Sequence, residues 1–271
     1  MKVKDYFLTQ EEFEIKEINP GILKTVPVPD SLEKYYKSEN YISHHQEEKS
    51  FKNWVYKSIQ KINLKYKKSI LDRYIISGKK ILDYGCGVGD FLKYIQKDYQ
   101  VLGMEPNAEA FKISGKKIGK ENMIASLQHL ENESLDGITL WHVLEHIPNQ
   151  EEFIPLLISK LKSKGKLIIA VPNFKSYDAR FYKNFWAAYD VPRHVFHFSK
   201  TGINNIFNTS STQVIKIKPL IFDSFYISIV SEKYRKNPFF WLKGSFIGLI
   251  SNFKALKNYE YSSLIYIIEK K

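Results

Sequence analysis

The chain has 271 residues, 44% of them hydrophobic, and a formal net charge of +12 at pH 7. No apolar run approaches the roughly 20 residues that a membrane-spanning helix needs, and residues 1–5 lack the apolar core of a signal peptide. The single cysteine, Cys86, excludes an internal disulfide and a multi-cysteine zinc site. These features favour a cytoplasmic globular protein with a sizeable core.

Residues 1–78 are expected to form a β arm followed by a helical cap. Apolar residues nearly alternate across 13–18, a turn follows at 19–21, and 22–28 is extended. Between residues 31 and 78 apolar residues recur at helical spacing, and Tyr41 and His44 are candidates to close over a ligand.

Basic residues dominate 49–80, where Asp72 is the single acid. Such a helix face can attract nucleic acid, anionic lipid or acidic glycans, although a solvated surface is the commoner explanation. No zinc-finger spacing or aromatic RNA-binding motif accompanies the charge, so nucleic acid is not an expected partner.

From residue 79 onward, short apolar runs alternate with helical patterns, which indicates a mainly parallel sheet. Strands are expected at 80–84, 101–105, 122–125, 137–141, 166–171, 214–217 and 262–268, and helices at 89–97, 108–118, 150–163 and 200–207. The expected fold is α/β, with a doubly wound, Rossmann-like, seven-stranded and mostly parallel sheet that carries helices on both faces. Residues 79–271 form its domain, with a substrate-covering insertion at 173–198 and inserted helices at 223–257 before the last strand.

The first of these strands ends in a glycine-rich loop, Asp83-Tyr84-Gly85-Cys86-Gly87-Val88-Gly89-Asp90. A strand, a tight turn and a helix start hold nucleotide-like ligands against backbone N–H groups. Gly89 comes one residue earlier than the third glycine of the dinucleotide fingerprint G-x-G-x-x-G. A fixed carboxylate at Asp83 suits a cation better than a pyrophosphate. The loop therefore resembles motif I of the Rossmann-like methyltransferases, whose cofactor S-adenosylmethionine has a sulfonium, an ammonium and no phosphate.

Three further segments continue this resemblance in the right order: Glu105, at the end of the second strand, the run Trp141-His142-Val143-Leu144-Glu145-His146-Ile147-Pro148, and 165–172. An acid at the end of the second strand can accept both ribose hydroxyls of a bound nucleoside, although it can also cap the next helix. Relatives often place an Asp where Ser126 stands. The resemblance implies a cofactor site built from Asp83, Gly85, Cys86, Gly87, Gly89, Glu105, Pro106, Asn107, Ser126, Leu127, Trp141 and His142.

The run around Glu145 also resembles ubiquinone-pathway O-methyltransferases, some of which bind a divalent metal at these positions. Here the residues are His142, Glu145 and His146, whose imidazoles and carboxylate are suitable ligands. The same residues form a structural turn in metal-free relatives, and we assign no metal ligand.

Residues 173–198 follow the fifth strand, so we expect them to cover the reacting methyl group. The stretch 186–199 resembles a signature of a bacterial branch related to ubiquinone-type and glycan-cluster methyltransferases. His194 is the candidate base, Asp190 would orient it or hold the substrate, and Arg193 would bind an acidic acceptor. In the structural alternative, Asp190 pairs with Arg193, and His194 caps the helix that begins near Ser199.

Apolar residues recur at helical spacing across 238–257, and lysines accompany them. Such a helix can lie on a membrane surface, here the inner membrane, whereas core packing or a homodimer contact is the commoner explanation. If the acceptor is lipid-linked, it is expected to dock here.

We therefore expect S-adenosylmethionine-dependent methyl transfer, at oxygen, to a small-molecule, glycan or lipid-linked acceptor. The alternatives are an NAD(P)-dependent oxidoreductase and a non-catalytic binding protein with the same fold. A nucleic-acid methyltransferase is disfavoured because Trp141-His142-Val143-Leu144 stands where the amino-methylating enzymes carry their Pro-Pro motif.

Overall fold

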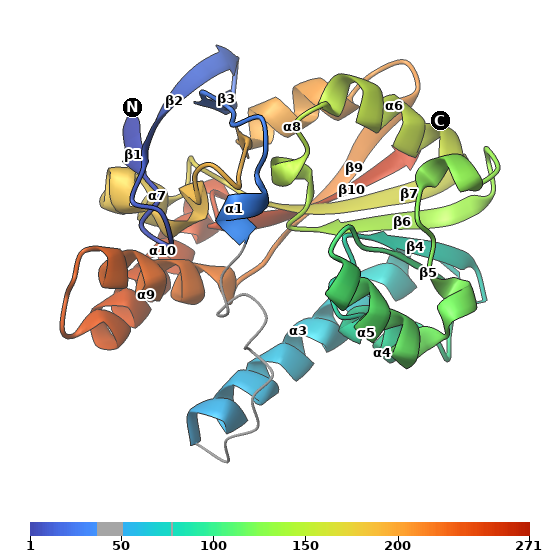
Figure 1. The fold of residues 1–271 in the computed structure, drawn as a ribbon, viewed down its shortest axis with the longest axis horizontal. Helices are drawn as coiled ribbons and strands as arrows, with labels where there is room; N and C mark the ends of the chain where they lie inside the picture. Colours follow the sequence, from blue (N-terminus) through green and yellow to red (C-terminus); the bar gives the residue numbers. More distant parts are fainter. Residues whose placement is uncertain (37–50, 77) are drawn as a thin grey trace.

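The computed structural model describes residues 1–36, 51–76 and 78–271, and a six-stranded sheet lies at its centre (Figure 1). The strands lie in the order β5-β4-β6-β7-β10-β9. Their bounds are β4 Lys80–Tyr84, β5 Gln100–Met104, β6 Leu135–Trp141, β7 Leu161–Pro172, β9 Thr212–Pro219 and β10 Ser263–Lys270. The first four strands in this order are parallel, and β10 runs antiparallel to both of its neighbours. The predicted mostly parallel α/β sheet is confirmed.

The number of strands differs from the prediction, because 122–125 does not form a strand. Met123 makes an isolated parallel bridge to Gly103, and the N–H of Ile124 donates to the Gly103 carbonyl at 2.9 Å. The N–H of Asn122 is the preceding donor on the side that faces β5, but it is bonded to the Gly119 carbonyl at 3.2 Å, at the 3₁₀ turn Lys120–Asn122. Because this turn uses that donor, pairing is limited to one bridge, and the described sheet has six strands instead of seven.

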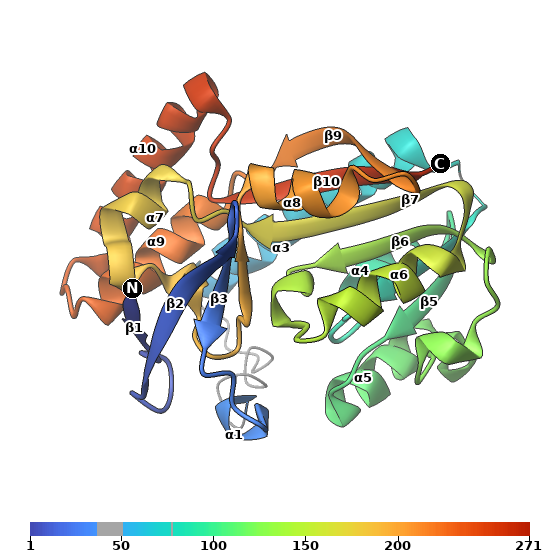
Figure 2. The ribbon, with the colours of Figure 1, turned by 90° about the horizontal axis from the view of Figure 1, so that it is seen from above.

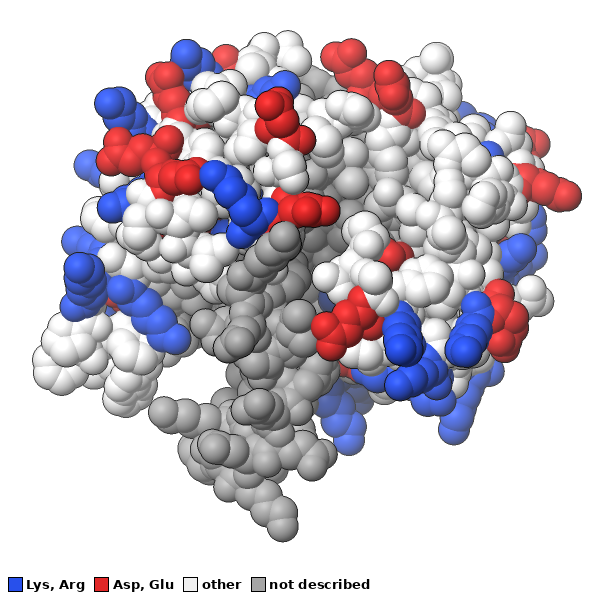
Figure 3. Space-filling view, in the orientation of Figure 1, with Lys and Arg blue, Asp and Glu red and all other residues white. Residues whose placement is uncertain are grey.

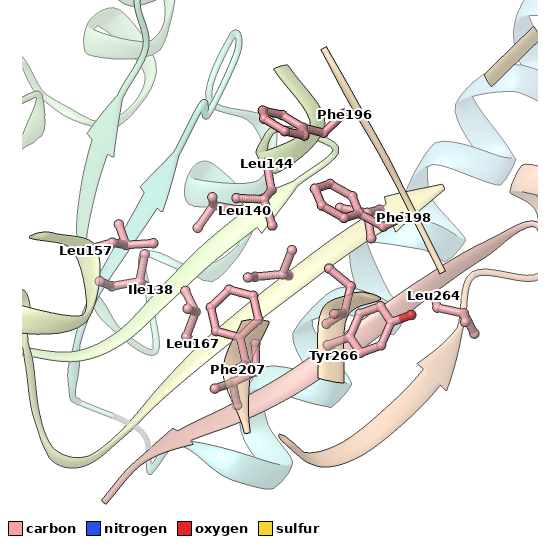
Figure 4. Close-up of a cluster of buried hydrophobic side chains, with 14 of the residues drawn as sticks. Ile138, Leu140, Leu144, Leu157, Leu167, Phe196, Phe198, Phe207, Leu264 and Tyr266 are labelled. Atoms are coloured by element: carbon pink, nitrogen blue, oxygen red, sulfur yellow. The ribbon is translucent and has the colours of Figure 1, made fainter. Parts of the chain in front are cut away.

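Helices cover both faces of the sheet because successive strand residues are apolar and point to opposite sides. In β7, Leu167 and Ile169 belong to one core and Ile168 and Ala170 to the other. Figure 1 shows helices above the sheet and below it. Above lie α6 Gln150–Lys160 and α8 Lys200–Phe207, and below lie α3 Phe51–Tyr74, α4 Asp90–Ile95 and α5 Ala108–Ile118. Figure 4 shows the upper core, where side chains of the upper helices meet those of β6, β7 and β10.

The N-terminal arm forms a second sheet with a strand from far along the chain. Its strands are β1 Lys2–Lys4, β2 Glu12–Asn19, β3 Ile22–Val26 and β8 Phe196–Phe198, in that order. In the antiparallel pair of β3 and β8, Leu23 lies opposite His197. The predicted arm is confirmed, and it is joined to the segment that we expected to cover the substrate. Helix α1 Glu33–Tyr36 follows the arm, whereas Tyr41 and His44 lie outside the described residues.

The remaining segments lie at the carboxyl end of β7. Residues 173–198 contain α7 Tyr177–Tyr182 and two 3₁₀ turns, Lys183–Phe185 and Ala187–Tyr189. The predicted helical insertion is the pair α9 Asp223–Tyr234 and α10 Phe240–Asn258. Figure 2 shows α10 at the outside of the molecule, beyond α9 and away from the arm. Among the described residues, no helix combines the length and the apolarity that a bilayer span requires. The division into 1–78 and 79–271 stays a prediction.

Candidate functional site

The glycine loop lies at the carboxyl end of β4 and starts α4. The N–H groups of Gly85 and Cys86 both donate to the Met104 carbonyl, at 2.8 and 3.0 Å, which anchors the loop to β5. Gly87 has a φ of +54°, and a Cβ placed there would meet no atom of the described part of the chain within 4 Å. The loop therefore presents bare backbone to open space at Gly87, which is the contact surface that a nucleoside ligand needs.

Glu105 closes this loop from the end of β5. Its Oε2 accepts a hydrogen bond from the N–H of Gly87 at 2.8 Å, and its Oε1 accepts one from the N–H of Asn107 at 3.0 Å. A carboxylate has about four lone-pair positions. Two backbone donors leave two positions for the adjacent hydroxyls of a ribose. The capping contact and the ribose contact, which the sequence left as alternatives, are therefore geometrically compatible.

Asp83 is buried near the carboxyl end of β4, just before the loop. Its carboxylate is 2% exposed and accepts a hydrogen bond from Thr139 Oγ1 at 2.6 Å. Burial raises the pKa of Asp83 to about 7, against the opposing effects of Thr139 and Lys67. Near neutral pH this carboxyl is therefore only partly ionised, and an ammonium placed beside it would favour the charged form.

Lys67 is a functional candidate that sequence reasoning missed. Its Nζ lies 4.5 Å from the centre of the Trp141 ring and 6.0 Å from that of Phe91. Burial lowers its pKa, while the charges of Asp83 and Asp223 act in the opposite direction. Only the packing of α3 distinguishes this lysine from the other basic residues of the same helix.

The remaining predicted cofactor residues lie around the same edge of the sheet. Asn107 caps α5, accepting hydrogen bonds from the N–H groups of Glu109 and Ala110 at 3.1 and 3.0 Å. Ser126 caps the 3₁₀ turn that follows it, and the Leu127 side chain is buried in the core. Burial raises the pKa of the Cys86 thiol to about 12, so this cysteine is not a thiolate nucleophile.

His142 follows β6 with a φ of +58° and lies between two carboxylates. Its Nε2 is 2.9 Å from Asp223 Oδ2 at the start of α9, and its Nδ1 is 3.3 Å from Glu145 Oε1. Although burial favours the neutral ring, Asp223 and Glu145 raise the pKa of His142 to about 10. The protonated ring of His142, a predicted cofactor residue, therefore contacts the helical insertion through Asp223. The sequence did not indicate Asp223 as its partner.

Glu145, His146 and His194 form a cluster, with one ligand atom from each within 4.8 Å of the others, in which Glu145 and His194 are buried and His146 is half-buried. The ring Nδ1 of His146 lies 2.9 Å from the Arg193 carbonyl, and that of His194 lies 2.8 Å from the Ala188 carbonyl. Because a carbonyl only accepts, each Nδ1 carries a proton, and in the neutral ring Nε2 is the acceptor. Burial, together with His194, lowers the pKa of His146 to about 4.

This cluster could hold a divalent cation, but it is not the set that the sequence indicated. His142 faces Asp223 and Glu145 and is replaced in the cluster by His194 from another segment. Among the described residues, neither oxygen of Glu145 has an aligned hydrogen-bond donor, although His142 compensates its charge at 3.3 Å.

Asp190 and Arg193 pair with each other, which favours the structural alternative. Arg193 Nε and Nη2 contact the two Asp190 oxygens at 3.0 and 2.5 Å, and Nη2 also lies 3.2 Å from Asp5 Oδ1. Its Nη1 donates to the Tyr35 carbonyl at 3.0 Å, and the residue is 2% exposed. All three guanidinium nitrogens are used within the protein. The structural alternative also placed His194 at the start of the next helix as its cap. This part is wrong, because Ser199 caps α8.

The N-terminal arm also holds His194. The hydroxyl of Thr25, on β3, donates to the His194 carbonyl at 2.7 Å and lies 3.0 Å from His197 Nε2. His194 Nε2 is 3.9 Å from Asp190 Oδ2. Neither Thr25 nor Asp5 carried a signal in the sequence, because only the pairing of β3 with β8 brings them to this site.

Two other surfaces carry no assignment. A hollow of about 430 Å³ lies at the amino ends of β4 and β5, lined by Lys80, Gln96, Tyr99, Gln100, Val101, Leu102 and Asn122. Ligands of doubly wound sheets bind at the opposite, carboxyl edge.

On the face that Figure 3 shows, Lys and Arg gather over α4 and α5 but alternate with acids, so this face has no continuous basic track.

Comparison with known proteins agrees with this geometry. A family model described as a methyltransferase domain matches residues 43–216. The ubiquinone biosynthesis O-methyltransferase of Idiomarina loihiensis is 25% identical over 171 residues, which are 58% of this chain and 70% of that protein. The mitochondrial protein of the same name from Rattus norvegicus is 33% identical over 112 residues. That match spans 36% of this chain and about a third, 32%, of the rat protein.

Among solved structures, the geranyl diphosphate C-methyltransferase of Streptomyces coelicolor superposes with a TM-score of 0.58. The alignment covers 84% of this chain and 86% of that protein at 9% identity. At this identity the similarity is one of fold, and it extends over most of both chains.

Proposed function

The chain belongs to the methyltransferase domain family, and from this premise we propose that it transfers a methyl group from S-adenosylmethionine to an oxygen atom of its acceptor. The acceptor is a small molecule, a glycan or a lipid-linked compound. S-adenosylmethionine supplies an electrophilic methyl group on a sulfonium. The protein must bind the cofactor, align the acceptor, exclude water and remove the acceptor's proton.

The observation that carries the proposal is the open face of Gly87 beside Glu105. A side chain at Gly87 would fill this space, and Glu105 retains two lone-pair positions there for ribose hydroxyls. In our proposal, Asp83 faces the ammonium of the methionine moiety, and Lys67 faces its carboxylate. The two groups lie close enough for each to shift the pKa of the other.

On the acceptor side we propose that His194 Nε2 receives the proton of the hydroxyl. The hydrogen bond from Nδ1 to the Ala188 carbonyl fixes the tautomer that leaves Nε2 free. Asp190 and Arg193 act as positioning residues, because they form an ion pair and Asp190 lies beside the His194 ring. The names of the relatives support oxygen as the methylated atom. The acceptor and a cytoplasmic location stay predictions.

The first experiment is isothermal titration of the purified protein with S-adenosylmethionine and, separately, with S-adenosylhomocysteine and NAD⁺. We expect micromolar binding of the first two and none of NAD⁺. Binding of NAD⁺ alone would favour the oxidoreductase alternative. A folded sample that binds none of the three would favour the non-catalytic alternative.

A further inference from the structure

Helix α10 exposes a continuous apolar stripe. Six large side chains recur every three or four residues and are 56–74% exposed: Phe239, Leu242, Phe246, Leu249, Phe253 and Leu256. Trp241 flanks the stripe and is 60% exposed, and Tyr226 of α9 is 67% exposed. Isolated exposed hydrophobic residues are common on monomers, but a contiguous stripe indicates an interaction site.

The stripe is not the surface with which α10 packs in the protein. That surface consists mainly of small residues, and a Cβ on Gly244 or Gly248 would lie 2.5 or 2.8 Å from the Cα of Ile229 or Phe225 in α9. Since α10 already meets α9 at close range through this opposite face, the apolar stripe remains exposed. Core packing, the commoner explanation at the level of sequence, does not account for it.

The charges around the stripe have one sign. Between residues 233 and 259 the chain has no acid, and its basic residues are Lys233, Arg235, Lys236, Lys243, Lys254 and Lys257. These six residues carry six positive charges, a number equal to half of the net charge of +12. The buried Glu232 compensates part of this charge, lying 3.3 Å from Lys243 and 3.9 Å from Arg235. The surface is therefore apolar, aromatic and basic.

We propose that α9 and α10 dock on the surface of a bilayer that carries anionic lipid headgroups. A helix with an apolar face, interfacial aromatic residues and lysines lies in the plane of the interface, with its apolar side in the acyl boundary. A second copy of this chain fits less well. A two-fold contact would place the same basic residues opposite each other, whereas anionic headgroups neutralise them.

Three contacts connect this docking surface to the predicted site. Ser251, on the buried side of α10, donates to Asp178 Oδ1 in α7 at 2.6 Å, and Trp186 Nε1 donates to Asp178 Oδ2 at 2.7 Å. Asp223, at the start of α9, pairs with His142. The bilayer would thus hold the acceptor segment 173–198 close to the lipid surface. This consequence depends on the proposed function, whereas the docking does not.

Flotation of the full chain with vesicles, without cofactor, tests the docking. We expect binding to vesicles of equal parts phosphatidylcholine and phosphatidylglycerol, and little binding to phosphatidylcholine alone. Phe246→Ser with Phe253→Ser should lower the partition coefficient at least tenfold by an order-of-magnitude estimate. Lys257→Glu should lower it roughly tenfold, and only on the anionic vesicles. The matched control is Ile76→Ser, because Ile76 is 76% exposed and lies outside α9 and α10.

Thermal unfolding should be unchanged in these variants, since every substituted side chain is exposed. Wild-type protein that remains unbound, or that binds both compositions equally, would overturn the proposal. So would a concentration-dependent dimer that Phe246→Ser with Phe253→Ser dissociates, since that result assigns the stripe to a second copy. Because flotation requires no methyl transfer, a failure of the proposed function leaves these outcomes interpretable.

Discussion

Arg193→Met provides the sharpest test of how the acceptor side is built. The substitution keeps most of the side-chain volume but leaves Asp5, fully buried, and Asp190, 26% exposed, without their cation. Removing one partner of a buried ion pair costs about 3–5 kcal/mol. Because water reaches Asp190, we expect the lower end, about 3 kcal/mol. For a chain of this size, 1 kcal/mol corresponds to roughly 2–4 °C, so the melting temperature should fall by about 6–12 °C.

The assay is urea unfolding at neutral pH, with Arg180→Met as the matched control because Arg180 is exposed and should change stability by less than about 0.5 kcal/mol. Combining Asp5→Asn with Arg193→Met should cost less than the sum of the two single changes, since the residues share one interaction. If Arg193→Met unfolds like the wild type but loses activity, Arg193 contacts the acceptor and the positioning role is wrong.

Four further outcomes are expected. Glu105→Gln should raise the Kd for S-adenosylmethionine about tenfold to a hundredfold in isothermal titration, because the hydrogen bonds to ribose lose their charge; an unchanged Kd would place the ribose elsewhere. His194→Gln should slow methyl transfer by about 100- to 10,000-fold while the Kd for the cofactor stays constant, and near-normal turnover would show that His194 is not the base. Since the folded pKa of His142 is raised to about 10, its ion pair with Asp223 stabilises the fold fully below about pH 6.5 and less as the pH rises toward 10. The urea midpoint of the wild type should therefore fall more steeply over this range than that of His142→Gln, and parallel slopes would contradict the raised pKa. A chelator should leave methyl transfer unchanged because His142 already balances Glu145, whereas a loss that a divalent cation restores would assign a metal to the Glu145 cluster.

The agreement between sequence and structure is best where the chemistry is local. The strand, glycine loop and helix from β4 to α4 were predictable because an apolar run, three glycines and a helical pattern occupy one short segment. The predicted helix at 108–118 agrees with α5 because Asn107 caps it directly. The strand at 122–125 was wrong because the N–H of Asn122, which a longer ladder with β5 would need, is bonded to the Gly119 carbonyl.

The acceptor side could be predicted only in part. His194 and Asp190 were identified because they lie in one short segment with a family resemblance. Asp5, Thr25 and Asp223, which contact Arg193, the His194 carbonyl and His142, are far away in the sequence. Contacts of this kind leave no periodic or spacing signal, because neither partner is constrained by its own neighbours along the chain.

The fold class, the glycine loop and the methyltransferase family could be read from local patterns in the chain, since each depends on hydrogen bonding and side-chain periodicity within a few residues. The groups that are buried together became evident only from the folded structure. It placed Lys67 beside Trp141, moved the His-Glu cluster from His142 to His194, and engaged the Arg193 nitrogens within the protein. It also showed that the apolar side of α10 is exposed, because close glycine packing against α9 occupies the other side. Burial and charge pairing depend on distances between segments, and the packing of the whole chain sets those distances.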